Sequence, residues 1–253
     1  MTAVLRTFLF AWQFLTAVPL SRSTHDAKPE ELAASMSWYP VVGCLLGALL
    51  AAANMVLVQV FSSQVTNIVL ILLLVAITRG LHQDGLADMV DGLAGGRTAQ
   101  ARLAIMRDGR IGAIGATGLF LALGLRYAGL NALPAGEHIA LLISMPVVGR
   151  WAMVMGAFHV TYARSEGGLA QPFLAHLSWW HLCLATITAG LVLTLLLGPW
   201  MALCSLLICT ALVRLSTVWF QKMFGGVTGD LLGATNEVAE ILFIVIVPVV
   251  LFR

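Results

Sequence analysis

Long apolar runs alternate with short polar connections along this chain. Most of these runs approach or exceed the length of about 20 residues that a helix needs to cross a bilayer. They cover residues 38–61, 65–81, 111–133, 139–160, 181–197 and 200–220. A shorter run, residues 238–252, extends only about 22 Å as a helix and carries Glu240 near its start, so it is marginal for a crossing. The pattern predicts an all-α, polytopic membrane helical bundle with six or seven transmembrane helices.

The N-terminal run has a different pattern from the others. Val4, Phe8, Trp12 and Leu15 recur at helical spacing, which predicts a helix that lies in the membrane interface or re-enters it. No small-residue cleavage site follows this run, so a signal peptide is not expected. The chain has no internal repeat and no low-complexity linker, and residues 1–253 are therefore expected to form a single domain.

Composition strengthens the membrane prediction. The chain is 60% hydrophobic and only 10% charged, with a mean hydropathy of +0.94, far from the composition of a soluble domain. Nucleic-acid binding has no support. The four cysteines lie inside apolar runs without a CxxC pair, and we interpret them as small packed residues rather than metal or redox groups. They are Cys44, Cys183, Cys204 and Cys209.

The basic residues favour one orientation in the membrane. Alternate connections contain all of the Lys and Arg between runs, whereas residues 62–64, 134–138 and 198–199 contain none. Basic connections stay in the cytoplasm. The prediction is a protein integral to a bacterial cytoplasmic (inner) membrane. Its cytoplasmic connections would be residues 21–37, 79–110, 161–180 and 221–236.

Carboxylates are concentrated in two stretches, residues 82–108 and 229–240, which hold seven of the twelve acidic residues. Asp84, Asp88 and Asp91 have i, i+4, i+7 spacing, which places them within an arc of about 60° on one helix face. Such a stripe is tolerable when a divalent cation bridges it, and Mg²⁺ combines one or two carboxylates with water and phosphate oxygens. The alternative is a solvated acidic face, although the intervening residues are apolar or Gly. We favour a metal and phosphate site.

Two arginines and another carboxylate follow this stripe. Arg107 and Arg110 flank Asp108 just before an apolar run. Arginine suits bidentate phosphate contact, so the two are candidate substrate-binding residues, with Asp108 as a candidate metal ligand. Ordinary anchoring at the cytoplasmic interface is the equally supported alternative.

The second acidic stretch, residues 225–240, reads as a Gly-rich loop that enters a helix. A helix N-terminus after such a loop is suited to anion binding, with Thr228 and Asn236 as candidate substrate-binding residues. Asp230 and Glu237 share a helix face and are candidate metal ligands. Asp230 could instead cap the helix, but capping does not explain Glu237.

His82 lies two residues before Asp84. It is a candidate general base, which would make His82, Asp84 and Asp88 the catalytic residues. A structural role is the more common one for a lone His at a membrane interface.

Several motifs together resemble a known family. LHQDGLADMVDG, IMRDGRIG and GGVTGDLLGATNE, with FLTAVPL and YPVVGCLLG, closely resemble the cobalamin synthase family, the adenosylcobinamide-GDP ribazoletransferases. The resemblance runs almost the whole length of the chain. Residues 162–168 depart from the more regular Ala-Arg-Glu-Gly-Leu-Gly pattern of the family, which leaves the roles of Arg164 and Glu166 open.

The resemblance implies an integral membrane transferase that acts late in cobalamin (vitamin B12) biosynthesis. Such an enzyme joins adenosylcobinamide-GDP to α-ribazole or its 5′-phosphate, releases GMP and uses Mg²⁺. Its partners would be these small molecules and the lipid bilayer, and a homo-oligomer stays open. The metal would be held by Asp84, Asp88, Asp91 and Asp108, with Asp230 and Glu237 binding metal or orienting the nucleophile.

Two other functions are alternatives. A CDP-alcohol phosphotransferase of phospholipid synthesis also carries Asp residues on membrane helices, but Met89 and Val90 and a missing Ala-Arg pair depart from its pattern. A cation transporter would place its carboxylates near the bilayer midplane. Release of CMP, or cation flux without nucleotide, would identify either one.

Overall fold

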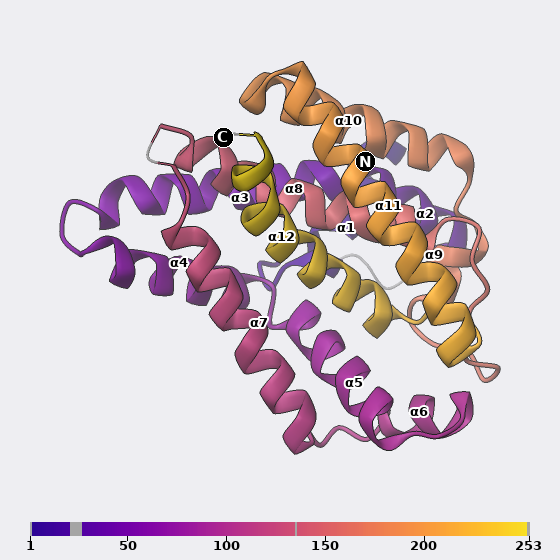
Figure 1. The fold of residues 1–253 in the computed structure, drawn as a ribbon. Helices are drawn as coiled ribbons and strands as arrows, with labels where there is room; N and C mark the ends of the chain where they lie inside the picture. The colour runs from indigo at the N-terminus through magenta and orange to yellow at the C-terminus, as the bar shows by residue number, and fades with distance from the viewer. Residues whose placement is uncertain (1, 21–26, 135, 252–253) are drawn as a thin grey trace.

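The computed structural model describes residues 2–20, 27–134 and 136–251. These residues form helices and a single isolated β-bridge, which confirms the predicted all-α fold (Figure 1). The helices are α1 (Ala3–Leu15), α2 (Pro29–Ser35), the 3₁₀ turn η1 (Met36–Trp38), α3 (Tyr39–Leu57), α4 (Ser63–Ile77), α5 (Leu81–Gly95), α6 (Ala99–Ile105), α7 (Ala113–Asn131), α8 (His138–Ala157), α9 (Gln171–Ala175), α10 (Trp179–Leu197), α11 (Pro199–Phe224) and α12 (Gly229–Leu251).

Within the described residues, five segments are long and apolar enough to cross a membrane. They are Pro29–Leu57, which includes α3, and the helices α7, α8, α10 and α11. A sixth is reached only when α4 and α5 count as one span, although these two helices meet at an angle of 88°. The predicted apolar run 65–81 therefore ends as a helix at Ile77, and the acidic helix α5 turns away from it.

The break between α4 and α5 has a local cause. Arg79 and Gly80 both adopt left-handed backbone conformations, with φ of 55° and 65°. This conformation is costly for a residue other than Gly. It is held in place because the Arg79 guanidinium donates to the carbonyls of Gln13 and Thr16 at the end of α1, at 3.3 and 3.2 Å. The N-terminal helix thereby fixes the corner from which α5 departs.

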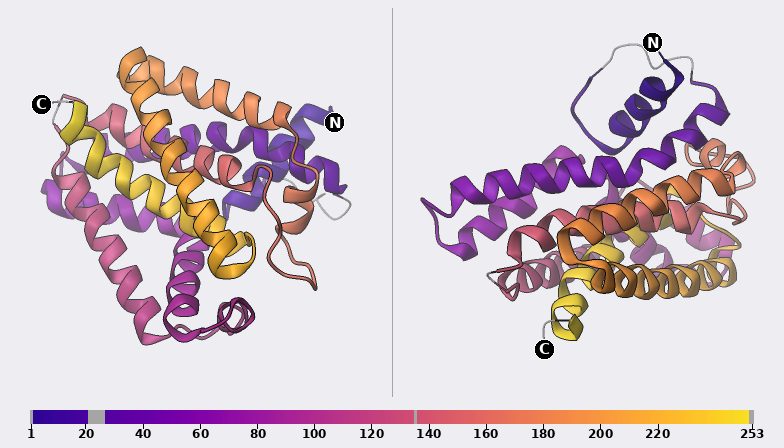
Figure 2. Two further views of the ribbon diagram at one scale, coloured as in Figure 1. Left: turned by 45° about the vertical axis from the view of Figure 1, so that its right-hand side comes forward. Right: turned by 90° about the horizontal axis from the view of Figure 1, so that it is seen from above.

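Helix α1 is the N-terminal helix that the sequence predicts. Phe10, Ala11 and Leu15 are buried, whereas Val4 and Leu5 are exposed, so the helix presents an apolar face both inward and outward. It lies at the edge of the bundle beside α3 (Figure 2).

The core is centred on α8, which is buried along most of its length. Gly43 and Gly47 of α3 lie against the α8 backbone, so that a Cβ on Gly47 would approach the Ile143 carbonyl oxygen to 2.5 Å. Small residues at this spacing allow membrane helices to approach closely. Helix α12 packs on the opposite part of the core, against α5, α7 and α8 (Figure 1).

The C-terminal helix is longer than its apolar run suggests. Predicted as a short segment over residues 238–252, it instead begins at Gly229 and continues to Leu251, a length of about 35 Å at 1.5 Å per residue. Asp230, Glu237 and Glu240 therefore lie on the same continuous helix as its apolar end.

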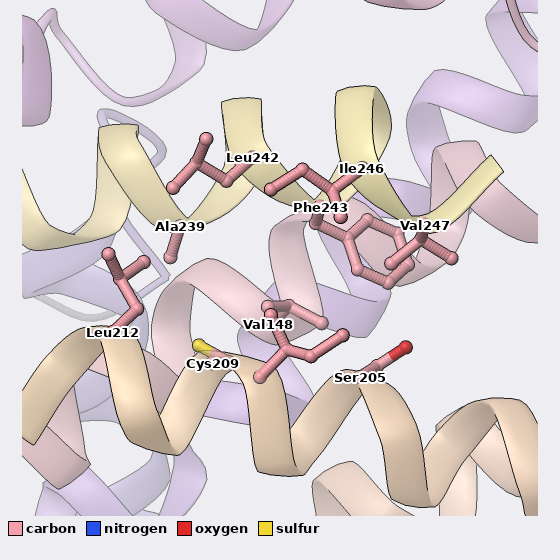
Figure 3. Close-up of a pocket in the computed structure, with 10 residues that line it drawn as sticks. Val148, Ser205, Cys209, Leu212, Ala239, Leu242, Phe243, Ile246 and Val247 are labelled. Atoms are coloured by element: carbon pink, nitrogen blue, oxygen red, sulfur yellow. The ribbon is translucent and has the colours of Figure 1, made fainter. Parts of the chain in front are cut away.

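A small apolar cavity separates α12 from α8 and α11 (Figure 3). Its volume of about 30 Å³ is that of roughly one water molecule, so it is a packing gap rather than a substrate site. It is lined by Val148, Ser205, Ile208, Cys209, Leu212, Ala239, Leu242, Phe243, Ile246 and Val247.

Candidate active site

The acidic face of α5 forms the centre of the candidate site. Asp84 is exposed, and Asp88 and Asp91 are partly buried, while the residues between them are largely buried in the bundle. The helix predicted from the i, i+4, i+7 spacing is therefore present, and its carboxylates lie on the side that is not packed.

The two acidic stretches touch. Gly85, next to Asp84, lies against the first turn of α12, where a Cβ on Gly85 would come within 2.5 Å of the Asp230 carbonyl oxygen. Two turns further along α12, Gln83 Nε2 donates to Glu237 Oε1 at 2.9 Å. The N-terminus of α12 thus lies directly beside the acidic face of α5, at the same end of the bundle (Figure 1).

Burial and neighbouring carboxylates both disfavour the charged form of Asp88. Helix α5 is not among the segments that are long and apolar enough to span by themselves. The pKa of its Asp88 carboxyl is raised to about 7. Desolvation is the largest cause, followed by the negative charges of Asp84 and Asp230. Arg164 acts in the opposite direction. A bound cation would relieve this repulsion.

Arg164 reaches the cluster from the connection between α8 and α9. Its Nη2 donates to Asp230 Oδ2 at 2.8 Å. The placement follows from the isolated bridge between Tyr162 and Val227, in which Val227 N donates to the Thr161 carbonyl at 2.8 Å. The bridge joins the connection to the loop before α12, so Arg164 and Asp230 are held together.

The carboxylate oxygens of this cluster are ligands of the kind that Mg²⁺ prefers. Among the described residues, no three His, Cys, Asp or Glu side chains are grouped so as to hold a metal ion. Mg²⁺, however, uses one or two carboxylates and takes the rest of its shell from water and substrate phosphate. Asp84, Asp88 and Asp230 carry hard oxygen atoms, and the charges of Asp84 and Asp230 both raise the pKa of Asp88.

Asp91 is already engaged with the backbone. Its two carboxylate oxygens accept hydrogen bonds from Gly112 N and Gly115 N, both at 2.7 Å. These are amides at the N-terminus of α7, where a negative charge is stabilising. The structure thus gives Asp91 a capping role that joins α5 to α7.

Asp108 and Arg110 lie beyond Asp91 on an open surface. Arg110 binds the Asp108 carboxylate through Nε and Nη2 at 2.9 and 2.6 Å. This contact lowers the pKa of Asp108. Both residues line a cavity of about 340 Å³ that they share with Asp91 rather than with Asp84.

Arg107 points to a different space. It forms an ion pair with Glu166 and lines a cavity of about 560 Å³ between α6, the connection after α8 and the end of α11. Arg164 lines the same cavity, and its hydrogen bond to Asp230 connects the cavity to the start of α12.

Thr228 and Asn236, predicted to bind substrate, are both fully buried. Thr228 Oγ1 accepts from Leu231 N at 3.3 Å and so caps α12. Asn236 Nδ2 donates to Glu240 Oε1 at 3.2 Å. Thr228 Oγ1 also donates to Asp230 Oδ2 at 3.4 Å and so contacts the site at the start of α12, whereas the Asn236 contact lies in the buried part of that helix.

Glu237 belongs to a buried ionic network instead of the acidic face. Its Oε2 accepts from Arg126 Nη2 of α7 at 2.8 Å, and the same Nη2 lies 2.9 Å from Glu240 Oε2. Arg150 of α8 completes the network by pairing with Glu240. Because Gln83 of α5 also binds Glu237, the network ties four helices together just inside the acidic site.

His82 lies beside this network, buried to 1% exposure, and its Nε2 has no partner among the described residues. His82 therefore lies on the buried side of α5, whereas Asp84 is exposed. The prediction that it is a base stays a prediction.

Sequence reasoning did not find some of the residues that organise the site. The sequence leaves the role of Arg164 open and gives no signal for Gln83, although Gln83 lies within the HQDG motif. Arg126 is a charge within an apolar run, which is a recognised signal for a functional or paired group. That signal does predict an interhelical hydrogen bond for Arg126, which is confirmed, but it does not identify Glu237 as the partner.

Fold and site together define a class: a polytopic α-helical membrane protein with an acidic, arginine-flanked site at one end of its bundle. The comparison with protein families then identifies the family. The Cobalamin-5-phosphate synthase family matches residues 7–248, and the chain belongs to it.

Curated relatives cover nearly the whole chain. The chain is similar to the adenosylcobinamide-GDP ribazoletransferase of Syntrophobacter fumaroxidans, with 41% identity over 92% of this chain and 94% of the relative. The proteins of the same name from Geotalea daltonii and Chlorobaculum tepidum are each 37% identical, over 94% and 91% of this chain and 95% and 90% of their own lengths. No solved structure matches the chain.

Proposed function

We propose that this protein transfers the adenosylcobinamide phosphate moiety from adenosylcobinamide-GDP to α-ribazole or its 5′-phosphate and releases GMP, late in cobalamin biosynthesis. The contact between the acidic face of α5 and Asp230 at the start of α12 carries the proposal in structural terms. This contact brings together carboxylates that would hold a metal, and the metal would bind the diphosphate of the substrate. The chain belongs to the Cobalamin-5-phosphate synthase family.

Each residue contributes to binding or orientation. Asp84, Asp88 and Asp230 would hold Mg²⁺, which when bound neutralises the charge on the diphosphate. Arg164 orients Asp230 through its hydrogen bond. A ribose hydroxyl of the acceptor forms a bond to the phosphorus next to the cobinamide. The bond from this phosphorus to the bridging oxygen breaks, that oxygen leaves as part of GMP, and the hydroxyl proton passes to solvent water. Arg107 lies where it can bind a phosphate group, and Glu237 supports the site from the buried network.

We place the site on the cytoplasmic side. The connections around it contain six of the fourteen Lys and Arg residues, and basic connections remain in the cytoplasm. Arg102 donates to the Met223 carbonyl at 2.7 Å, so the connection after α5 and the end of α11 share this end of the bundle. The basic residues of these connections are Arg97, Arg102, Arg107, Arg110, Arg164 and Lys222.

The test compares the purified protein with Asp84→Asn and Asp88→Asn, using Mg²⁺-dependent release of GMP and formation of the cobamide product. Removal of one charged ligand from a phosphoryl-transfer site should lower kcat by about 10²- to 10³-fold. Glu137→Gln, in the turn between α7 and α8 at the opposite end, serves as the matched control. Full activity in both Asp variants would refute the proposal, as would release of CMP from a CDP-alcohol or cation flux without nucleotide.

A further inference from the structure

We propose that the cavity between α6 and the connection after α8 binds the 5′-phosphate of the phosphorylated acceptor, with Arg107 and Arg164 as its phosphate-binding residues. The inference rests on the proposed function and extends it to the choice between the two acceptors. The cavity has a volume of about 560 Å³, enough for a nucleotide-sized group.

The cavity combines charge with an apolar floor. Its polar lining includes Arg107, Arg164 and Glu166, while Leu103 and Phe224 supply apolar surface. A phosphorylated nucleoside has the matching character, with an anionic group at one end and a flat aromatic base at the other. Two of the elements that line it, α6 and the end of α11, lie at the end of the bundle that carries α5 and the start of α12 (Figure 1).

Arg164 connects the cavity to the reaction centre. Its Nη2 is bound to Asp230 at 2.8 Å, whereas its Nε is buried and has no hydrogen-bond partner among the described residues. A buried donor without an acceptor is costly, so an oxygen that reaches this atom from the cavity would be stabilised. One guanidinium can therefore contact both Asp230 and a phosphate group that lies in the cavity.

Arg107 is paired with an exposed carboxylate that a phosphate can replace. Its side chain and that of Glu166 are 43% and 56% exposed. An ion pair of this kind contributes little to stability. A phosphate dianion carries more charge than a carboxylate and offers three acceptor oxygens, so it should displace Glu166 from Arg107.

The one anion that the metal site does not accommodate belongs to the acceptor rather than the donor. In the proposed function the diphosphate of the GDP substrate is bound through a metal at Asp84, Asp88 and Asp230, and guanosine itself carries no further anion. The 5′-phosphate of the acceptor is the additional anion. It lies one ribose ring away from the attacking hydroxyl, which fits a pair of arginines next to Asp230.

The experiment measures binding and selectivity separately. Calorimetric titration of the purified protein, without the GDP donor, with α-ribazole 5′-phosphate and with α-ribazole tests the cavity independently of turnover. The ratio of kcat/KM for the two acceptors is then measured with the donor present. Arg107→Gln and Arg164→Gln should each lower this ratio, and the affinity for the phosphorylated acceptor, by about tenfold to a hundredfold. Glu166→Gln should raise both, because the competing carboxylate is removed.

Arg97→Gln is the matched control, since Arg97 is an exposed arginine of the same connection that does not line the cavity. Equal losses for both acceptors in the Arg107 and Arg164 variants would overturn the inference, and so would a rise in KM for the GDP donor alone. Selective binding of the phosphorylated acceptor without any turnover would instead support phosphate binding in the cavity and refute the proposed function.

Discussion

Gly85→Ala should separate the two acidic stretches without removing any carboxylate. A Cβ at this position would lie 2.5 Å from the Asp230 carbonyl oxygen and 2.9 Å from its Cα, whereas ordinary van der Waals contact begins at 3.4 Å. The contacted atoms are backbone, so α5 and the start of α12 must move apart by nearly 1 Å. A displacement of about 1 Å within a catalytic site can cost 10²-fold in rate, or about 2.7 kcal/mol of transition-state stabilisation.

The assay is steady-state GMP release, with thermal unfolding in detergent as a measure of folding. We expect kcat to fall by about 100-fold, with a loss of about 1–3 kcal/mol in stability from overpacking that is partly offset by the higher helix propensity of Ala. Gly124→Ala is the control, because a Cβ on this helical glycine of α7 meets no atom within 4 Å. Unchanged kcat in Gly85→Ala would show that close contact between α5 and α12 is not needed for the reaction.

Two further predictions concern charge. Arg126→Met should destabilise the protein by about 3–5 kcal/mol, because it leaves buried Glu237 and Glu240 without this partner, and a melting temperature close to that of the unmodified protein would contradict the ionic network. The pKa of Asp88, raised to about 7 from an unfolded value of about 3.9, means that the folded metal-free protein binds the proton more tightly than the unfolded chain. The stability due to Asp88 should therefore be present below about pH 4 and be lost as pH rises to about 7. Melting temperatures measured in EDTA should fall over this pH range, and Mg²⁺ should reduce the fall. The Asp88→Asn variant should not show this pH dependence.

Much of the fold could be predicted because the apolar runs are long and the acidic spacing is regular. Asp84, Asp88 and Asp91 share one face of α5, whereas a strand would place Asp91 on the face opposite Asp84. The basic connections also predict that the second stretch lies at the same end of the bundle as the first, and the approach of Gly85 to Asp230 agrees with this. Contact between the stretches required the structure, because Gly85 and Asp230 are distant in sequence.

Depth explains why Glu237 does not share the position of Asp230. Seven residues along a helix return to the same face but advance about 10.5 Å along the axis. Asp230 therefore lies at the end of the bundle, while Glu237 lies within it, beside Arg126. The sequence pattern gives the face of a residue but not the depth to which its helix is packed.

Other roles depended on distant partners that no local pattern contains. Asp91 fits the acidic stripe by spacing, yet its oxygens are bound to amides of Gly112 and Gly115 that only the packing of α7 brings near. Arg164 likewise acquires its role from the bridge between Tyr162 and Val227.

The buried network also sets an order for assembly in the membrane. Arg126 and Arg150 lie on α7 and α8, which are synthesised before α12 supplies Glu237 and Glu240. Each arginine within a bilayer costs about 2.5–3.5 kcal/mol when unpaired. The two helices therefore enter the membrane carrying charges that are neutralised only when α12 arrives. Arrival of α12 completes the bundle and, in the same event, brings Asp230 to α5, so a chain that has not finished assembling is also a chain without a complete site.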